Sequence, residues 1–267
     1  MSDYNIREFP SSRIATIDVC AIGKQKHHMC VLLECDVTES RQKLRALKSS
    51  GCKVSFNSWL VKVIANTLKE HSEASAFLYG KKRIIIFEDI NISLLVEKKL
   101  AGMKVPIPIV LEKTHTKSIS EITKEIEVAK DEELSGNSIV INRKTSLSES
   151  LYYYLPGFLR RRIWKILLRY PRTIYKKMGN VAVTFVGMYG QIKGWFIHTT
   201  IHPVSFGIGS VVKKPAVINN GIKIREILNM TVLIDHDVID GVPMAKFINN
   251  LVRSIENGSE LPDTCDY

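Results

Sequence analysis

The stretch LIDHDVIDGVPMAKF, Leu233 to Phe247, runs a hydrophobic strand into His236 and places Asp240-Gly241 where a helix begins. A histidine at the end of a strand is held by rigid backbone, and a neutral imidazole accepts a proton from a thiol or hydroxyl near pH 7. An ordinary strand-to-helix turn has the same pattern, with Asp240 as the helix N-cap and His236 in the core. Spacing alone does not decide between a general base and a structural turn.

Length, composition and cysteine content restrict the class of protein. The chain has 267 residues, of which 45% are hydrophobic, and this is enough for one large core. No run of 18 apolar residues and no basic-then-apolar start is present, so neither a membrane span nor a secretory signal is predicted. The five cysteines are odd in number and form no CxxC pair. They favour a reducing cytoplasm over a disulfide framework, and no metal site is predicted.

The positive charge is concentrated in one interval. The net charge is +11, and no Asp or Glu lies between Glu149 and Glu226, whereas thirteen Lys or Arg residues lie between Arg160 and Arg225. A field of one sign attracts an anionic partner, which leaves nucleic acid, an acidic membrane surface and a phosphate-bearing cofactor as candidates. No recognised nucleic-acid motif accompanies the charge, so nucleic acid is the least favoured.

Hydrophobic periodicity predicts a mixture of strands and helices. The residues Ser118 and Glu121 have capping-box spacing, Thr38 is a candidate N-cap, and two prolines within 103–111 favour an edge strand. The mixture indicates an α/β or α+β single domain over residues 1–267. Predicted strands cover 29–37, 83–87, 90–96, 103–111 and 203–212, and two more lie within 180–190, before a Gly-rich turn, and within 218–235, after a turn at 219–221. Predicted helices cover 39–50, 55–71, 118–134 and 240–257, and the basic segment 156–179 is a helix that Pro171 should end or kink.

Six stretches of the chain resemble one family in its own order. The stretch IDHDVIDGVPMAKFINNL resembles the DHRxxDGxxxAxFL signature of the 2-oxoacid dehydrogenase acyltransferases, the dihydrolipoyl acyltransferase catalytic domains related in fold to chloramphenicol acetyltransferase. The resemblance covers roughly Arg13 to Asn257 and implies a two-layer α+β sandwich, a mixed sheet with helices packed on it. The other stretches are HMCVLLECDVTESRQKLRAL, VSFNSWLVKVIANTLKEH, DINISLLVEKKLAGMKVPIPIV, GNVAVTFVGMYG and SFGIGSVVKKPAVINNGIKIREILNMTVLID.

The resemblance implies catalytic roles for three residues. His236 would be the general base that deprotonates a thiol or hydroxyl acceptor. Thr184 stands where the family has the serine of TISN, so its hydroxyl would donate to the tetrahedral oxyanion. A strand threonine with a satisfied hydroxyl is the alternative for Thr184. Asp240 would orient the turn by pairing with an arginine.

The resemblance also implies coenzyme A as substrate and a trimer with active sites between neighbouring subunits. Lys213 and Lys214 lie where the family has a short basic turn near the cofactor, and basic side chains favour the phosphates of coenzyme A. A solvated hairpin end is the alternative for these lysines. Gly241 would allow the close turn on the cofactor side. The implied reaction is acyl transfer between a CoA thioester and a thiol, hydroxyl or amine.

Four departures from the family pattern bear on function. No lipoyl domain is present, which favours a small acceptor or a lipoyl protein acting in trans, and Asp237 replaces an arginine. The polar end LPDTCDY predicts a trimer and no larger cage. A basic insertion at about 145–178 would wall a channel, cover the trimer or contact an anionic membrane through 158–177. The rival function is a non-catalytic relative that acts as a CoA-binding or membrane-associated scaffold.

Overall fold

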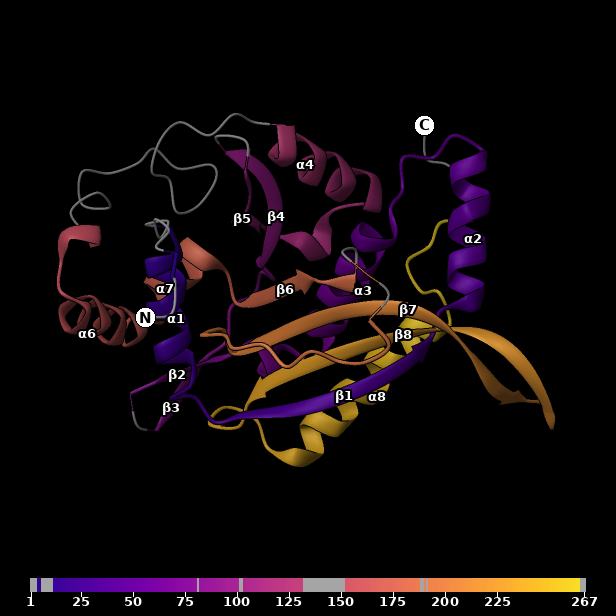
Figure 1. Ribbon diagram of the computed structural model, residues 1–267. Helices are drawn as coiled ribbons and strands as arrows, with labels where there is room; N and C mark the ends of the chain where they lie inside the picture. Colours follow the sequence, from indigo (N-terminus) through magenta and orange to yellow (C-terminus); the bar gives the residue numbers. More distant parts are fainter. Residues whose placement is uncertain are drawn as a thin grey trace.

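A six-stranded mixed sheet, in the order β1-β8-β7-β6-β4-β5, forms the centre of the molecule (Figure 1). The computed structural model describes residues 4–5, 12–80, 82–100, 103–131, 152–187, 190 and 192–264. Strand β6 pairs in parallel with β4 and β7, and the remaining pairs are antiparallel. A separate two-stranded ribbon joins β2 to β3. The strands are β1 (His28–Asp36), β2 (Phe77–Tyr79), β3 (Arg83–Ile85), β4 (Ile92–Leu100), β5 (Met103–Leu111), β6 (Val181–Phe185), β7 (Val204–Ile218) and β8 (Gly221–Asp235).

The helices form two groups. Helices α2, α3, α4 and α8 pack on one another and on the sheet, whereas α1, α6 and α7 gather at one end of it (Figure 1). The α-helices are α1 (Ser12–Gly23), α2 (Thr38–Ser49), α3 (Phe56–Glu70), α4 (Ile119–Asp131), α6 (Gly157–Leu168), α7 (Pro171–Met178) and α8 (Gly241–Glu256), and the short 3-10 turns are η1 (Ser72–Ser75) and η2 (Thr114–Thr116).

The main core lies between the first group of helices and one face of the sheet. Val183 of β6, Phe206 of β7 and Val232 of β8 belong to one buried cluster with Leu60 of α3 and Phe247 of α8. Successive strand residues point to opposite faces, so the intervening residues, Thr184 among them, point to the other face. Burial of each large apolar side chain stabilises the fold by about 2 kcal/mol.

The two longest strands form a hairpin that extends beyond the sheet (Figure 1). Asn219 and Asn220, with φ of 51° and 61°, supply the two left-handed residues of its turn. Strand β1 pairs with β8 only from Ile227 to Asp235, so no described residue adds a third strand to the hairpin beyond Ile227. The sequence predicted that β7 would end at residue 212, but the strand continues to Ile218.

Local sequence signals were right at two positions and wrong at one. Strand β5, with its two prolines, lies at an edge of the sheet as predicted. The Ser118 and Glu121 capping box is also confirmed, because each side chain accepts a hydrogen bond from the other residue's backbone N–H. Thr38 is not the N-cap, since it is the first residue of α2 and its hydroxyl accepts the N–H of Glu226 at 2.8 Å. The hydrogen bond of the Thr38 side chain with β8 therefore takes the place of the predicted N-cap contact.

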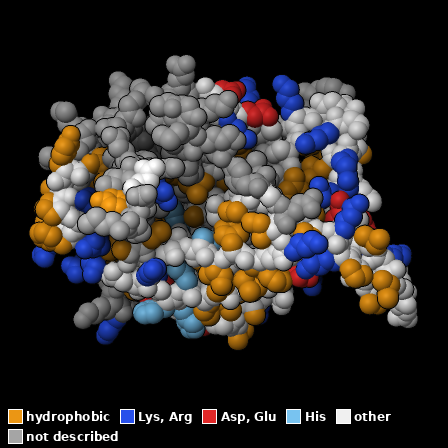
Figure 2. Space-filling view, viewed as in Figure 1, with side chains coloured by type: hydrophobic (Ala, Val, Ile, Leu, Met, Phe, Trp, Pro, Cys, Tyr) orange, Lys and Arg blue, Asp and Glu red, His pale blue; other side chains and the backbone are white. Residues whose placement is uncertain are grey.

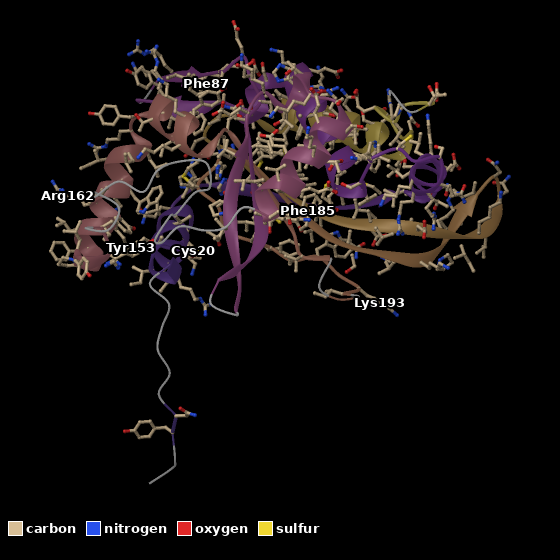
Figure 3. The ribbon with its side chains drawn as sticks, turned by 90° about the horizontal axis from the view of Figure 1, so that it is seen from above. Cys20, Phe87, Tyr153, Arg162, Phe185 and Lys193 are labelled. Atoms are coloured by element: carbon tan, nitrogen blue, oxygen red, sulfur yellow. The ribbon has the colours of Figure 1, made fainter. Side chains whose placement is uncertain are left out.

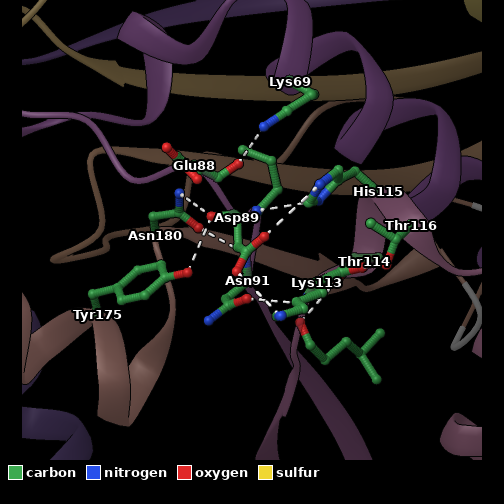
Figure 4. Close-up of polar contacts among 12 residues, drawn as sticks. Lys69, Glu88, Asp89, Asn91, Lys113, Thr114, His115, Thr116, Tyr175 and Asn180 are labelled. Carbon is green, nitrogen blue, oxygen red and sulfur yellow. Dashed lines mark hydrogen bonds and ion pairs between the residues drawn. The ribbon is translucent and has the colours of Figure 1, made fainter.

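The join between α7 and β6 is fixed by main-chain contacts (Figure 4). Gly179 has a φ of 75°, and a Cβ there would lie 2.2 Å from the carbonyl oxygen of Asn91. The Asn91 carbonyl accepts the N–H groups of Asn180 and Val181 at 3.0 and 3.2 Å. The carbonyl of Asp89 accepts the Tyr175 hydroxyl at 3.2 Å, which ties α7 to the same point. Glycine is required at residue 179 by both its φ and this close approach.

Helix α6 docks on α1 through a buried charge. Arg160 donates from Nε to Oδ2 of Asp18 at 2.6 Å, and the Asp18 side chain is fully buried. The Tyr152 hydroxyl donates to the same oxygen at 2.8 Å and accepts Nε1–H of Trp164 at 2.9 Å. Trp164 therefore faces inward, so one side of the insertion helix packs on the chain itself.

Two further observations concern the described residues. No helix among them is long and apolar enough to cross a membrane. Cys20, Cys30 and Cys35 are free thiols, whereas Cys52 is disulfide-bonded, which departs from the expectation of an entirely reduced set of cysteines.

Candidate active site

His236 lies one residue beyond the end of β8, as the sequence predicts. Its backbone N–H donates to the carbonyl of His27 at 3.0 Å, which extends the β1–β8 ladder past the pair His28–Asp235. The side chain is exposed and makes no hydrogen bond or ion pair with a described residue. Its backbone is thus fixed while its side chain is exposed and has no partner among the described residues, which is the arrangement a general base requires.

The acidic residues on either side of His236 have different partners. Asp235 is buried and forms an ion pair with Lys26, just before β1. Asp237, which stands where the family has an arginine, accepts from Nδ1 of His27 at 2.9 Å. His27 is therefore a second exposed histidine beside this turn, and its Nε2 makes no hydrogen bond with a described residue.

Asp240 and Gly241 open α8 without the contacts expected of them. Asp240 is the N-cap residue, yet its side chain makes no cap hydrogen bond and no ion pair with a described residue. The expected arginine partner of Asp240 is therefore absent among the described residues, and the acidic residues of this turn that have partners are Asp235, with Lys26, and Asp237, with His27. A Cβ at residue 241 would meet no atom within 4 Å and the residue has no left-handed φ, so the turn itself does not require Gly241.

Histidine side chains gather at this end of the sheet (Figure 2). Burial lowers the pKa of His198 and of His202 to about 4, and it also lowers the pKa of His28. Those three rings are consequently neutral near pH 7. Among the described residues no group of His, Cys, Asp or Glu is arranged to hold a metal ion.

Thr184 lies half-buried on the sheet face opposite the helices. It is paired with Gly207, which is paired with Thr231 on β8. The segment 192–200 crosses this face, because a Cβ on Gly207 would lie 2.9 Å from Nδ1 of His198. Phe185, the next residue of β6, is labelled near the middle of the sheet in Figure 3. The position of Thr184 leaves its hydroxyl on the side of the sheet that no helix of the first group covers.

Three buried polar atoms in the part of the molecule on the same side of the sheet as Thr184 have no hydrogen-bond partner among the described residues. They are Nδ1 of His198, Oγ1 of Thr231 and Oδ1 of Asn229. Buried polar groups are normally paired, so unpaired ones point to a bound polar group or water. This cluster was not predicted, because it arises from the register of β6, β7 and β8.

A single chain does not bring His236 and Thr184 together. Thr231, in the same row as Thr184, precedes His236 by five residues, which is about 17 Å of strand. Two strand spacings, about 10 Å, separate β6 from β8 in the perpendicular direction. A site that uses both side chains therefore needs a second copy of the chain.

Lys213 and Lys214 lie within β7 rather than in a turn, which corrects the predicted position. Lys213 is exposed and is paired with Glu226, ten residues before His236 and about 30 Å from it along β8. Lys214 is held by Glu34 at 2.5 Å and lies 5.6 Å from the centre of the Trp195 ring. Neither lysine reaches His236 of its own chain.

Comparison with known families identifies the family to which this chain belongs. The model of the family "2-oxoacid dehydrogenases acyltransferase (catalytic domain)" matches residues 20–138 and 177–262, more than half of the chain. This chain belongs to that family. The interval that the family model leaves unmatched, 139–176, contains α6 and most of α7.

Individual relatives agree with the family match. The chain is 24% identical over 243 residues to the lipoamide acyltransferase component of the branched-chain alpha-keto acid dehydrogenase complex of Bacillus subtilis, covering 87% of this chain and 47% of that protein. A dihydrolipoyllysine-residue acetyltransferase component of Rickettsia prowazekii is also 24% identical, over 94% of this chain and 54% of its own length. The chain therefore spans about half the length of the curated relatives it matches.

Solved structures confirm the predicted fold class. Dihydrolipoamide acetyltransferase of Azotobacter vinelandii superposes with a TM-score of 0.67 at 16% identity, covering 96% of this chain and 94% of that one. A chloramphenicol acetyltransferase superposes with a TM-score of 0.51 at 12% identity, covering 96% and 97% of the two chains. The mixed sheet with helices packed on it is thus the fold of this acyltransferase family.

Proposed function

We propose that the chain is a CoA-dependent acyltransferase whose general base is His236 and whose oxyanion donor is Thr184. The observation that carries the proposal is the exposed ring of His236, which lies at a fixed strand end and has no competing partner among the described residues. Membership of the acyltransferase family supports the reaction class. The acceptor is a thiol, hydroxyl or amine, and the reduced form of lipoamide, dihydrolipoamide, carried by another protein is one such thiol.

Residue spacing in a relative supports the two assignments in the turn. In the dihydrolipoamide acetyltransferase of Azotobacter vinelandii, a serine, a histidine and an asparagine four positions after that histidine have been studied for their role in the catalytic mechanism. His236 and Asp240 have the same separation. Asp240 is therefore proposed to act in the turn through a neighbouring protomer, since it makes no polar side-chain contact with a described residue of its own chain.

The proposed mechanism is acyl transfer through a tetrahedral intermediate. His236 removes the proton of the acceptor while the acceptor atom attacks the carbonyl carbon of the thioester. The Thr184 hydroxyl donates a hydrogen bond to the resulting oxyanion. When the intermediate collapses, the carbon–sulfur bond breaks and the thiolate of coenzyme A takes the proton from His236. Lys213 and Gly241 are the candidate contacts for the cofactor, and Lys214 must first release Glu34.

Replacement of His236 tests the base directly. We expect His236→Ala to lower the rate of acetyl transfer from acetyl-CoA to dihydrolipoamide by about 100-fold or more, because general-base catalysis contributes that much. His27→Ala is the matched control, since His27 is also exposed and lies at the same sheet end. Formation of acetyl-dihydrolipoamide is measured by mass spectrometry. A loss in His27→Ala with none in His236→Ala would instead assign the base to the pair of His27 and Asp237.

Variants of Thr184 separate catalysis from an inherited scaffold. Thr184→Ser keeps a hydroxyl donor and should stay within about tenfold of the wild type, whereas Thr184→Val should lose about 100-fold. If the wild type transfers no acetyl group to a thiol, an alcohol or an amine yet binds coenzyme A in calorimetry, the chain is a CoA-binding scaffold and the catalytic proposal is wrong. The basic insertion supports the scaffold function only if the scaffold is associated with a membrane.

A further inference from the structure

The outward face of α6 combines basic and apolar side chains. Six exposed residues form this face, and we call it the α6 face; they are Phe158, Arg161, Arg162, Lys165, Ile166 and Arg169. They fall on one side of the helix, because residues 158, 162, 165 and 169 recur at helical spacing. Figure 3 shows Arg162 pointing away from the molecule, and Figure 2 shows basic and hydrophobic side chains together over α6.

No described residue neutralises the charges of the α6 face. None of its three arginines and one lysine forms an ion pair or hydrogen bond with a described residue, whereas Arg160, on the inward side, is paired with Asp18. Arg172 of α7 is exposed and unpaired with any described residue as well. Four like charges within about three turns repel one another, and this repulsion lowers the stability of the helix. An external anion bound to the face would offset the repulsion.

The apolar side chains on the same face restrict the kind of anion. Phe158 is 67% exposed, Ile166 is 46% exposed, and Tyr170, immediately after α6, is 61% exposed. The phosphate backbone of a nucleic acid makes no favourable contact with an exposed isoleucine. The boundary between lipid headgroups and acyl chains, in contrast, accommodates aromatic and aliphatic side chains beside cationic ones. A second copy of this chain would carry the same net charge of +11, which disfavours a contact between two α6 faces.

The α6 face is also held rigidly in its orientation. Its opposite side is fixed to α1 by the buried contact of Arg160 with Asp18 and by Trp164. At the end of α7, Tyr175 is stacked on Phe87 at 3.8 Å. A helix that is already folded and anchored loses little conformational entropy when it docks.

From these observations we propose that the α6 face docks on a membrane surface rich in anionic phospholipid. The cations contact the phosphates, and Phe158 and Ile166 enter the headgroup region. The helix lies parallel to the surface, because α6 has 12 residues, about 18 Å, and is not long enough to cross a bilayer.

Vesicle flotation tests the docking with two charge-matched variants. One variant combines Arg162→Glu, Lys165→Glu and Arg169→Glu. The control combines Lys48→Glu, Lys124→Glu and Lys130→Glu, which alters three exposed lysines on α2 and α4, unpaired with any described residue, by the same total charge. On phosphatidylcholine vesicles with about one-third phosphatidylglycerol, the α6 variant should lose at least tenfold in partitioning and the control less than about threefold. Circular dichroism melts establish that both variants are folded.

A third variant and a second ligand complete the test. Phe158→Ser with Ile166→Ser should weaken binding most at high salt, where the contribution of the charges is screened. A wild type that does not float with the anionic vesicles would overturn the proposal, and so would equal losses in the two charge variants. Loss of binding to a DNA duplex by the α6 variant, without loss of vesicle binding, would assign the face to nucleic acid instead.

Discussion

Among individual residues, histidines of this chain divide into exposed and buried ones with different consequences. His236 is exposed and was found from its sequence motif. The pairing of His27 with Asp237 was not predictable, because it depends on the β1–β8 register between residues 210 positions apart. The ion pair of Lys26 with Asp235 was missed for the same reason. Sequence motifs therefore identify the residue that ends a strand, whereas cross-strand partners need the fold.

The buried histidines predict a pH dependence of stability. The pKa of His202 falls to about 4 through burial, and Thr200 and Met178 satisfy both nitrogens of the neutral ring. The unfolded chain binds the proton more readily, so the stabilisation is full above about pH 6.5 and is lost as the pH falls from there towards 4. Each such histidine should lower the free energy of unfolding by about 2 kcal/mol between pH 7 and pH 5.

Urea unfolding at a series of pH values measures this effect. His202→Gln should reduce the pH slope between pH 7 and pH 5, even though it lowers stability at every pH. Asp36 and Asp263 have pKa values below their ordinary range, which lies near 4, so they do not contribute in this interval. An unchanged slope in the variant would show that His202 is not the group that titrates.

Among the elements, the sequence predicted helices and edge strands better than lengths and faces. The strand β7 is longer than predicted. Lys213, Lys214 and Pro215 have low strand propensity, so the sequence predicted an end before them. They nevertheless pair with β8, in a part of the hairpin where no described residue adds a third strand. The basic helix is amphipathic in sequence, and its Trp164 faces α1 through Tyr152. An amphipathic pattern predicts a helix without saying which partner covers its apolar side.

The docking of α6 on α1 depends on one ion pair. Replacement of Arg160 by Met would leave the carboxylate of Asp18 buried with only the Tyr152 hydroxyl, which should cost about 3 kcal/mol or more. Arg161→Met is the matched control, since Arg161 is exposed and unpaired with any described residue and should change stability by less than about 0.5 kcal/mol. Denaturant unfolding measures both variants. If adding Asp18→Asn to Arg160→Met restores no stability, the loss comes from packing and not from the buried charge.

For the whole molecule, the predicted site residues are spread along the length of the sheet. His236 lies at one end, Thr184 in the middle and Lys213 towards the projecting hairpin. The sequence identified these residues through their family positions, but no pattern along one chain gives their separation. The trimer and a cytoplasmic location stay predictions.

Mixing two inactive variants tests whether active sites are shared between protomers. In a random trimer of His236→Ala and Thr184→Val chains, about one quarter of the interfaces combine an intact histidine with an intact threonine from different chains. Co-expression in equal amounts should therefore restore about one quarter of the wild-type rate. A rate no higher than that of the separate variants would place both residues of each site in one chain.

The close contact at Gly179 has a consequence for the segment that the family model leaves unmatched. The chain enters β6 through a gap between backbone atoms that admits only glycine, two residues after the family match resumes. Whatever length of polypeptide precedes that gap, the strand behind it starts at the same place. An exchange of residues 139–176 for a short linker would keep the start of β6 in place, but it would also remove the contacts of Tyr152 and Arg160 with the buried Asp18. A shortened chain would therefore also need Asp18→Asn, which removes the buried charge.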